Sequence, residues 1–159
     1  QLTVAVRVCT DDFVSCALAR GQFQTGLLHD SDWQDAAWLG GFTALRGEFE
    51  LPSKPIERAT AFASGVGCFA LTVNGVRASP DTYMEPGWSF VPTVRVLYRA
   101  FDVTSLLSNA SNAVGVRLGM CKFGYQGSFC QGAHGSLPTC RAFRMQLLVH
   151  YTDGSQVKV

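Results

Sequence analysis

Paired carboxylates are the first catalytic arrangement to consider in a chain with twelve acidic residues. Glycoside hydrolysis, for example, needs two carboxyl groups held about 5 to 9.5 Å apart. Asp102 is better interpreted as the N-cap of a short helical turn over residues 103–107. Glu48 and Glu50 alternate with Phe49 and are predicted to lie on an exposed strand face. We therefore predict that this chain is not an enzyme.

Nucleophilic and metal chemistry have equally little support. The three histidines, His29, His134 and His150, are scattered along the chain, and there is no Gly-x-Ser-x-Gly turn that would present a nucleophilic serine. One cluster of His29, Asp30, Asp32 and Asp35 could offer ligands to calcium. We interpret this cluster instead as an acidic, solvated connector. We therefore predict no metal and no cofactor.

Aromatic residues in two loops are the candidates for binding sugar, because their rings can stack on the apolar faces of sugar rings. The loops cover residues 83–90 and 123–129. Tyr125, between Gly124 and Gln126-Gly127, is the best candidate for an exposed ring. Trp88 could contact sugar or could pack beneath the Pro86-Gly87 turn. The candidate sugar contacts are Tyr125, Trp88, Tyr83 and Phe123, with Phe129 nearby, whereas Trp33 and Trp38 are assigned to core or junction packing.

The six cysteines indicate disulfides, because none has the Cys-x-x-Cys spacing of zinc ribbons or redox motifs. Three disulfides would place the chain in an oxidising compartment. Cys9 and Cys16 could pair across a hairpin, and Cys130 with Cys140 would close a glycine-rich loop. Cys68 would then pair with Cys121, although fifteen pairings of six cysteines are possible.

A glycosylation sequon supports a secreted location. Asn109-Ala110-Ser111 lies in a polar run that predicts an exposed turn. Low charge and plentiful Ser and Thr would suit a chain that carries glycan. We predict a secreted glycoprotein with glycan attached at Asn109.

Charge and hydropathy exclude two further classes of protein. The net charge is +1, which is far from the basic field that nucleic acid binding needs. No apolar run approaches the roughly 18 residues of a membrane span. We expect neither nucleic acid nor a membrane as a partner.

Short strands separated by Gly, Pro and Asn turns must position these residues. Residues 2–8 alternate in the period of a half-buried strand, and residues 16–24 return as its hairpin partner. Asn74-Gly75 is the strongest hairpin signal, because both residues tolerate the positive φ of a type I′ turn. Further strands are predicted over residues 45–51, 56–64, 67–73, 94–101, 113–118, 141–151 and 156–159. The fold class is all-β, a jelly-roll-like antiparallel β-sandwich.

Several motifs occur in an order typical of one family. They are Phe23-Gln24-Thr25-Gly26-Leu27-Leu28, Ser31-Asp32-Trp33, Ala37-Trp38-Leu39-Gly40, Val73-Asn74-Gly75, Pro86-Gly87-Trp88-Ser89, Phe101-Asp102-Val103-Thr104, Asn112-Ala113-Val114-Gly115, Leu118-Gly119 and Tyr151-Thr152-Asp153-Gly154-Ser155. Over residues 38–159 the chain thereby resembles the N-terminal β-sandwich domain of bacterial α-L-rhamnosidases. In that family the catalytic carboxylates belong to a separate helical-barrel domain. Members of the family often carry Gly-Trp-Tyr close to residue 120. This chain has Met120-Cys121-Lys122-Phe123 there instead.

The resemblance also implies a domain boundary. A fibronectin-type-III-like domain often precedes this sandwich in the family, and residues 2–24 resemble its last two strands. We therefore expect a terminal hairpin of such a partial module over residues 1–28 and the rhamnosidase-like sandwich over residues 29–159. The hairpin would be completed by a longer parent chain or by other copies of the same chain.

Two functions follow from these observations. The first hypothesis is a structural building block of an extracellular assembly, in which head-to-tail stacking through the 2–24 hairpin would propagate into a filament. The alternative is a carbohydrate-binding or substrate-positioning accessory domain of a larger α-L-rhamnosidase-like enzyme. An exposed aromatic patch near Tyr125 or Trp88 would favour the alternative.

Overall fold

The computed structural model describes residues 2–11, 15–34, 36–82, 84–87, 96–121 and 141–159. The chain divides into two compact units, Gln1–Gln34 and Asp35–Val159. The boundary predicted after residue 28 stays a prediction. Within the described residues no helix is long and apolar enough to cross a membrane.

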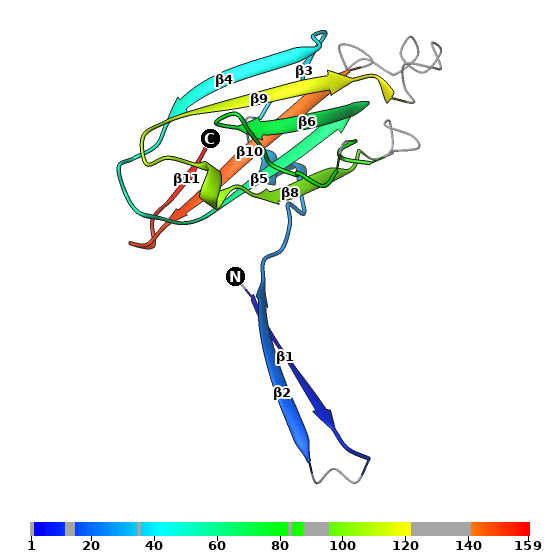
Figure 1. Ribbon diagram of the computed structural model, residues 1–159, viewed down its shortest axis with the longest axis vertical. Helices are drawn as coiled ribbons and strands as arrows, with labels where there is room; N and C mark the ends of the chain where they lie inside the picture. The colour runs from blue at the N-terminus through cyan, green and yellow to red at the C-terminus, as the bar shows by residue number, and fades with distance from the viewer. Residues whose placement is uncertain (1, 12–14, 35, 83, 88–95, 122–140) are drawn as a thin grey trace. The chain divides into compact units, whose positions relative to one another are not determined.

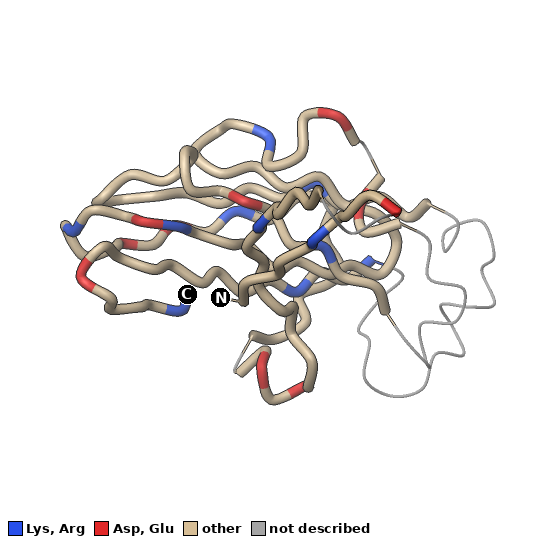
Figure 2. Tube along the Cα trace, turned by 90° about the horizontal axis from the view of Figure 1, so that it is seen from below, with Lys and Arg blue, Asp and Glu red and all other residues tan. Residues whose placement is uncertain are grey.

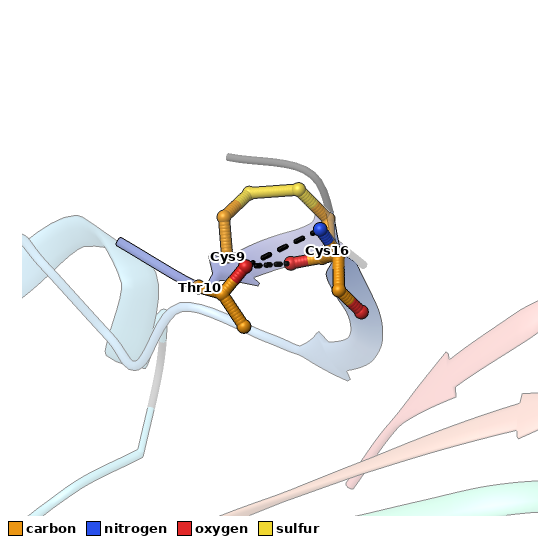
Figure 3. Close-up of a disulfide and its surroundings, with 4 residues drawn as sticks. Cys9, Thr10 and Cys16 are labelled. Atoms are coloured by element: carbon orange, nitrogen blue, oxygen red, sulfur yellow. Dashed lines mark hydrogen bonds between the residues drawn. A yellow bond between two sulfur atoms is a disulfide. The ribbon is translucent and has the colours of Figure 1, made fainter. Parts of the chain in front are cut away.

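The first unit is a β-hairpin followed by one helical turn. Strands β1 (Leu2–Cys9) and β2 (Cys16–Phe23) pair antiparallel, and a 3-10 turn, η1 (Asp30–Trp33), follows. Cys9 lies directly opposite Cys16, and their Cα atoms are 4.0 Å apart across the expected disulfide. Figure 3 shows the Thr10 hydroxyl beside this bridge, where it accepts the Ser15 N–H and donates to the Ser15 carbonyl, each at 3.3 Å.

One face of this hairpin is apolar and exposed. Leu2, Val4, Val6 and Val8 alternate along β1 and are each about half exposed or more. Directly opposed residues share a face of a sheet, so Ala17, Ala19 and Phe23 of β2 join them. Trp33 is buried, at 8% exposed, as its assignment to packing predicts.

The second unit consists of two antiparallel sheets that enclose one core (Figure 1). The larger has the order β11-β10-β5-β8, and β3 also pairs with β10. The smaller has the order β4-β9-β6-β7. The strands are β3 (Leu39–Gly40), β4 (Ala44–Glu50), β5 (Ile56–Val66), β6 (Cys68–Val73), β7 (Val76–Arg77), β8 (Tyr98–Asp102), β9 (Ser111–Gly119), β10 (Ala142–Tyr151) and β11 (Gln156–Lys158). The predicted all-β antiparallel sandwich is confirmed.

The core lies between the two sheets and follows from period-2 alternation. Phe69, Leu71 and Val73 of β6 point inward and are buried, and the residues between them face outward. Phe69 meets Phe143 of β10 edge to face, with ring centroids 5.1 Å apart. Trp38 is half-buried and packs on Val66 and Ala142, as predicted.

The hairpin between β6 and β7 has the predicted turn. Asn74 has φ 50° and Gly75 has φ 82°, so both adopt the left-handed conformation of a type I′ turn. The Asn74 side chain also donates to the Leu106 carbonyl and accepts the Ala113 N–H, each at 2.8 Å. The asparagine therefore ties this turn to the neighbouring strand β9.

The segment around Asp102 differs in detail from the prediction. Among the described residues the strand predicted over 94–101 extends from Tyr98 to Asp102. The helical turn is a 3-10 turn, η2 (Thr104–Leu106), with Val103 rather than Asp102 at the N-cap. Asp102 still contributes, because its carboxylate accepts the Thr104 N–H at 3.0 Å and the Thr104 hydroxyl at 2.6 Å. It can do so from the end of β8, since a short aspartate reaches backbone groups two residues ahead.

Charged residues are sparse in the second unit. Blue and red segments are interspersed along the sandwich in Figure 2. Glu48 and Glu50 are exposed on β4 on either side of the half-buried Phe49, as predicted. Glu48 forms an exposed ion pair with Arg46 at 2.5 Å.

Candidate functional site

The predicted sugar contacts Tyr83, Trp88, Phe123 and Tyr125 lie outside the described residues, as does the predicted Cys130–Cys140 pair. The structure does describe the residues from which their loops depart. These are Met84 to Gly87 on one side and Gly119 to Cys121 on the other. We call them, together with Cys68 and Phe69, the loop roots.

A disulfide holds the root of the second loop. Cys68, at the start of β6, is bonded to Cys121, and their Cα atoms are 5.8 Å apart. This is the pairing that the sequence predicted for these two cysteines. Gly119 lies opposite Cys68, and a Cβ atom there would approach the Cys68 sulfur to 2.9 Å. The glycine therefore makes room for the bridge.

Backbone hydrogen bonds hold the root of the first loop. Phe69 donates its N–H to the Glu85 carbonyl at 2.8 Å, and Glu85 donates in return at 3.4 Å. The two roots are thus fixed to consecutive residues of β6, Cys68 and Phe69. Residues far apart in the sequence, 85 and 121, are brought to one end of the sandwich.

Glu85 also anchors its root through a buried carboxylate. The side chain is 3% exposed and pairs with Arg99 at 3.3 Å. The Thr82 hydroxyl donates to the same carboxylate, and the Arg77 guanidinium donates to the Thr82 carbonyl. A buried charge of this kind is stable only because it is paired and hydrogen-bonded.

Three exposed apolar side chains lie within or beside the loop roots. Phe42 is 61% exposed, Met84 is 69% exposed and Met120 is 47% exposed. Phe42 lies at this end because the neighbouring Thr43 carbonyl accepts the Leu118 N–H at 2.8 Å. Sequence reasoning did not select these residues. The signal was weak, since single apolar residues beside turns are common on protein surfaces.

Hydrogen bonds organise the connector that contains His29, Asp30, Asp32 and Asp35, the residues considered above as possible calcium ligands. One carboxylate oxygen of Asp32 accepts the backbone N–H groups of Leu28 and His29 at 2.8 and 2.9 Å. Within the described part of the chain, no three His, Cys, Asp or Glu side chains converge as they would around a metal ion. Asp35 lies outside that part.

His150 and Asn109 lie apart from the loop roots. Partial burial lowers the pKa of His150, and the positive charge of Arg58 lowers it further. Asn109 is exposed on the turn before β9. This turn is held by the Asn112 side chain, which accepts the Ser108 N–H at 2.8 Å and donates to the Ala110 carbonyl at 2.8 Å.

Comparison with known proteins identifies the class of this sandwich. A family model described as the α-L-rhamnosidase N-terminal domain matches residues 54–159. The chain belongs to this family. An α-L-rhamnosidase of Streptomyces avermitilis is 34% identical over 116 residues, which are 72% of this chain and 11% of that protein. One from Formosa agariphila is 28% identical over 158 residues, with 86% of this chain and 16% of that protein covered.

Solved structures of α-L-rhamnosidases share the fold. The native enzyme from Aspergillus terreus matches with a TM-score of 0.72 and 25% identity, over 99% of this chain and 19% of that one. The enzyme from Dictyoglumus thermophilum matches with a TM-score of 0.76 and 23% identity, over 98% of this chain and 19% of that one. This chain therefore spans less than a fifth of the length of each of these relatives.

Proposed function

We propose that the chain is a non-catalytic accessory domain of a secreted α-L-rhamnosidase-like protein and that it binds or positions carbohydrate. The observation that carries the proposal is the family match combined with the loop roots. The Cys68–Cys121 disulfide and the backbone bridge between Phe69 and Glu85 hold the two loop roots on consecutive residues of β6. The aromatic residues predicted to contact sugar adjoin these roots in the sequence.

The first hypothesis, a building block of a filament, has no support in the comparisons. The relatives are named as rhamnosidases, and this chain matches one section of each. The accessory-domain alternative is therefore favoured. The exposed apolar face of the 2–24 hairpin fits packing against another part of a parent protein.

Secretion and glycosylation belong to the same proposal. Two disulfides are present among the described cysteines, and such bridges form and persist in oxidising compartments. The exposed turn position of Asn109 would give a glycosylating enzyme access to its side chain.

Isothermal titration of the full chain with rhamnose-terminated oligosaccharides tests the binding function. Tyr125→Ala and Trp88→Ala should each weaken binding by about tenfold, as expected for the loss of one buried aromatic contact. Phe42→Ala, at the same end of the sandwich, should have a smaller effect. Val76→Ala provides the control, because Val76 is 53% exposed at the opposite end of β6. Binding that none of the three aromatic substitutions weakens would contradict the proposed site.

A further inference from the structure

Asn74-Gly75 is the one asparagine–glycine pair in the chain, and the other two asparagines, Asn109 and Asn112, each precede alanine. An asparagine followed by glycine is chemically labile, because a glycine has no side chain to keep its backbone nitrogen away from the preceding amide. The turn between β6 and β7 therefore contains a reactive pair. The contacts of the Asn74 side chain decide when that pair can react.

The reaction is an intramolecular attack on the Asn74 amide. The Gly75 backbone nitrogen loses its proton and forms a bond to the side-chain carbonyl carbon of Asn74. The bond from that carbon to the side-chain nitrogen breaks, and the nitrogen takes up a proton and leaves as ammonia. Water then opens the five-membered ring, which leaves aspartate or isoaspartate at this position. No oxidant or reductant is consumed.

Three hydrogen bonds hold the Asn74 side chain in place. Its nitrogen donates to the Leu106 carbonyl and to the Asn112 side-chain oxygen, each at 2.8 Å. Its oxygen accepts the Ala113 N–H at 2.8 Å. Both hydrogens of the amide are therefore used in the folded chain. The side chain cannot adjust its torsions for attack by the Gly75 nitrogen without losing these contacts.

Asn112 is itself held firmly. The residue is 2% exposed, and its side-chain oxygen also accepts the Ser108 N–H at 2.8 Å. Its side-chain nitrogen donates to the carbonyls of Ser108 and Ala110 at 3.0 and 2.8 Å. The pair of asparagines thereby joins the β6–β7 turn to the turn that carries Asn109. Release of Asn74 requires these two turns to separate.

We propose that Asn74 is a deamidation site that the fold protects, and that it reacts when the β6–β7 turn opens. Three hydrogen bonds of ordinary net strength favour the closed turn over the open one by about a hundredfold. When opening is fast relative to the chemistry, the rate of modification follows the population of the open state. The site lies at the opposite end of β6 from Cys68 and Phe69, so its reaction is independent of carbohydrate binding.

The modified turn cannot close with the same contacts. An aspartate at position 74 still accepts the Ala113 N–H, but its carboxylate has no hydrogen to donate to the Leu106 carbonyl or to Asn112. Two acceptor oxygens would then face a negative charge and lose a donor each. Each deamidation therefore loosens this end of the sandwich irreversibly, together with the turn that carries Asn109.

Peptide mapping by mass spectrometry, after incubation of the full chain at mildly alkaline pH, tests the proposal. A blocked peptide with the sequence of residues 72–76 gives the rate of the same reaction without the fold. Asn74 in the folded chain should deamidate about a hundredfold more slowly than Asn74 in the peptide. Equal rates in the chain and the peptide would overturn the proposal.

A variant that releases the side chain should react faster. Asn112→Ala removes one acceptor of the Asn74 amide, and it should speed deamidation by about tenfold. Glu50→Ala is the control, because Glu50 is exposed on β4 opposite Ser111, and it should leave the rate unchanged. An Asn112→Ala chain that is folded and deamidates at the wild-type rate would show that these contacts do not protect Asn74.

The variant Asn74→Asp tests the consequence of the reaction and does not depend on Asn112→Ala folding. Aspartate tolerates the same type I′ turn, so a lower urea midpoint reports the two hydrogen bonds that the side chain no longer donates. Asn109→Asp, at an exposed position in the neighbouring turn, should leave the midpoint unchanged. An Asn74→Asp chain as stable as wild type would contradict the predicted loosening and overturn the proposal.

Discussion

Glu85 shows how one side chain can organise the end of the sandwich at which the loops begin. Its carboxylate is buried beside Arg99 and accepts the Thr82 hydroxyl, while its backbone pairs with Phe69. The residue therefore links three segments that are separate in the sequence. Its role is to position the loop root, and no catalytic function is required to explain its burial.

Replacing Glu85 should destabilise the sandwich. The change Glu85→Ala leaves the Thr82 hydroxyl and the Arg99 guanidinium without this acceptor, a loss of about 1–3 kcal/mol in the free energy of unfolding. Urea denaturation followed by circular dichroism measures it. Glu48→Ala breaks only an exposed pair and should cost about 0.5 kcal/mol or less. Equal effects of the two substitutions would show that the buried network contributes little.

Two aspartates should make the free energy of unfolding depend on pH. Hydrogen bonds from the Thr104 side chain and then from its backbone N–H hold the pKa of Asp102 below its usual range, and Lys54 and Ser155 do the same for the pKa of Asp153. A carboxyl whose folded pKa is depressed stabilises the fold above its unfolded pKa of about 3.9. That stabilisation is lost as the pH falls through the folded pKa.

The expected result is a lower urea midpoint at pH 2.5 than at pH 6. Asp102→Asn should be less stable than wild type at pH 6 and should lose less on acidification, because its side chain does not titrate. Glu48→Gln, on an exposed strand face, serves as the control. An Asp102→Asn variant with the acid dependence of wild type would show that Asp102 does not contribute to it.

The elements differ in what stabilises them. The sandwich strands bury alternate apolar residues in a shared core, whereas the β1–β2 hairpin exposes its valines and relies on its ladder and the Cys9–Cys16 bridge. A lone two-stranded hairpin is marginal in water at best. The disulfide should therefore matter far more to the first unit than its short loop would suggest.

The double change Cys9→Ser with Cys16→Ser should unfold the hairpin selectively. Closing so short a loop restricts the unfolded chain by roughly 2 kcal/mol, which is enough to decide the state of a marginal element. Amide hydrogen exchange should lose protection over residues 2–23 and retain it in β5 and β10. Unchanged protection in β1 and β2 would mean that other contacts hold the hairpin.

Local patterns predicted these elements well. Alternation located β1, the turn that follows it located β2, and short runs between Gly, Pro and Asn turns located most strands of the sandwich. Asn74-Gly75 specified its turn through two positive φ angles. Such features depend on neighbours in the sequence. Among the described residues, the strand predicted over 94–101 begins only at Tyr98, because a run of strand-forming residues does not fix where pairing with β5 begins.

The site was harder to predict, because it depends on which strands become neighbours. Phe42 is exposed beside the loop roots since Thr43 pairs with Leu118, a contact between β9 and the residues just before β4. The apolar cavity lined by Leu45, Phe49, Val116 and Phe143 likewise arises where strands of the two sheets meet. Contacts between segments so far apart in the sequence are not encoded by any local sequence pattern.

At the scale of the whole molecule, the main constraint on function is how small a fraction of each relative's length this chain covers. It covers 11% and 16% of two α-L-rhamnosidases and belongs to the family of their N-terminal domains. A module of this size can bind and position a ligand while other parts of a larger protein carry out chemistry. We therefore expect this chain to bind carbohydrate without hydrolysing it.

A single NMR time course of the full chain with an aryl α-L-rhamnoside in excess tests this expectation most directly. We predict saturable shifts in amide signals near Cys68 and Phe69, with the sugar signals unchanged over days. Steady release of free L-rhamnose by the purified chain would contradict the non-catalytic assignment. A titration that shifts no signals at the loop roots, with rhamnosides or with longer rhamnose-terminated oligosaccharides, would contradict the proposed carbohydrate-binding function.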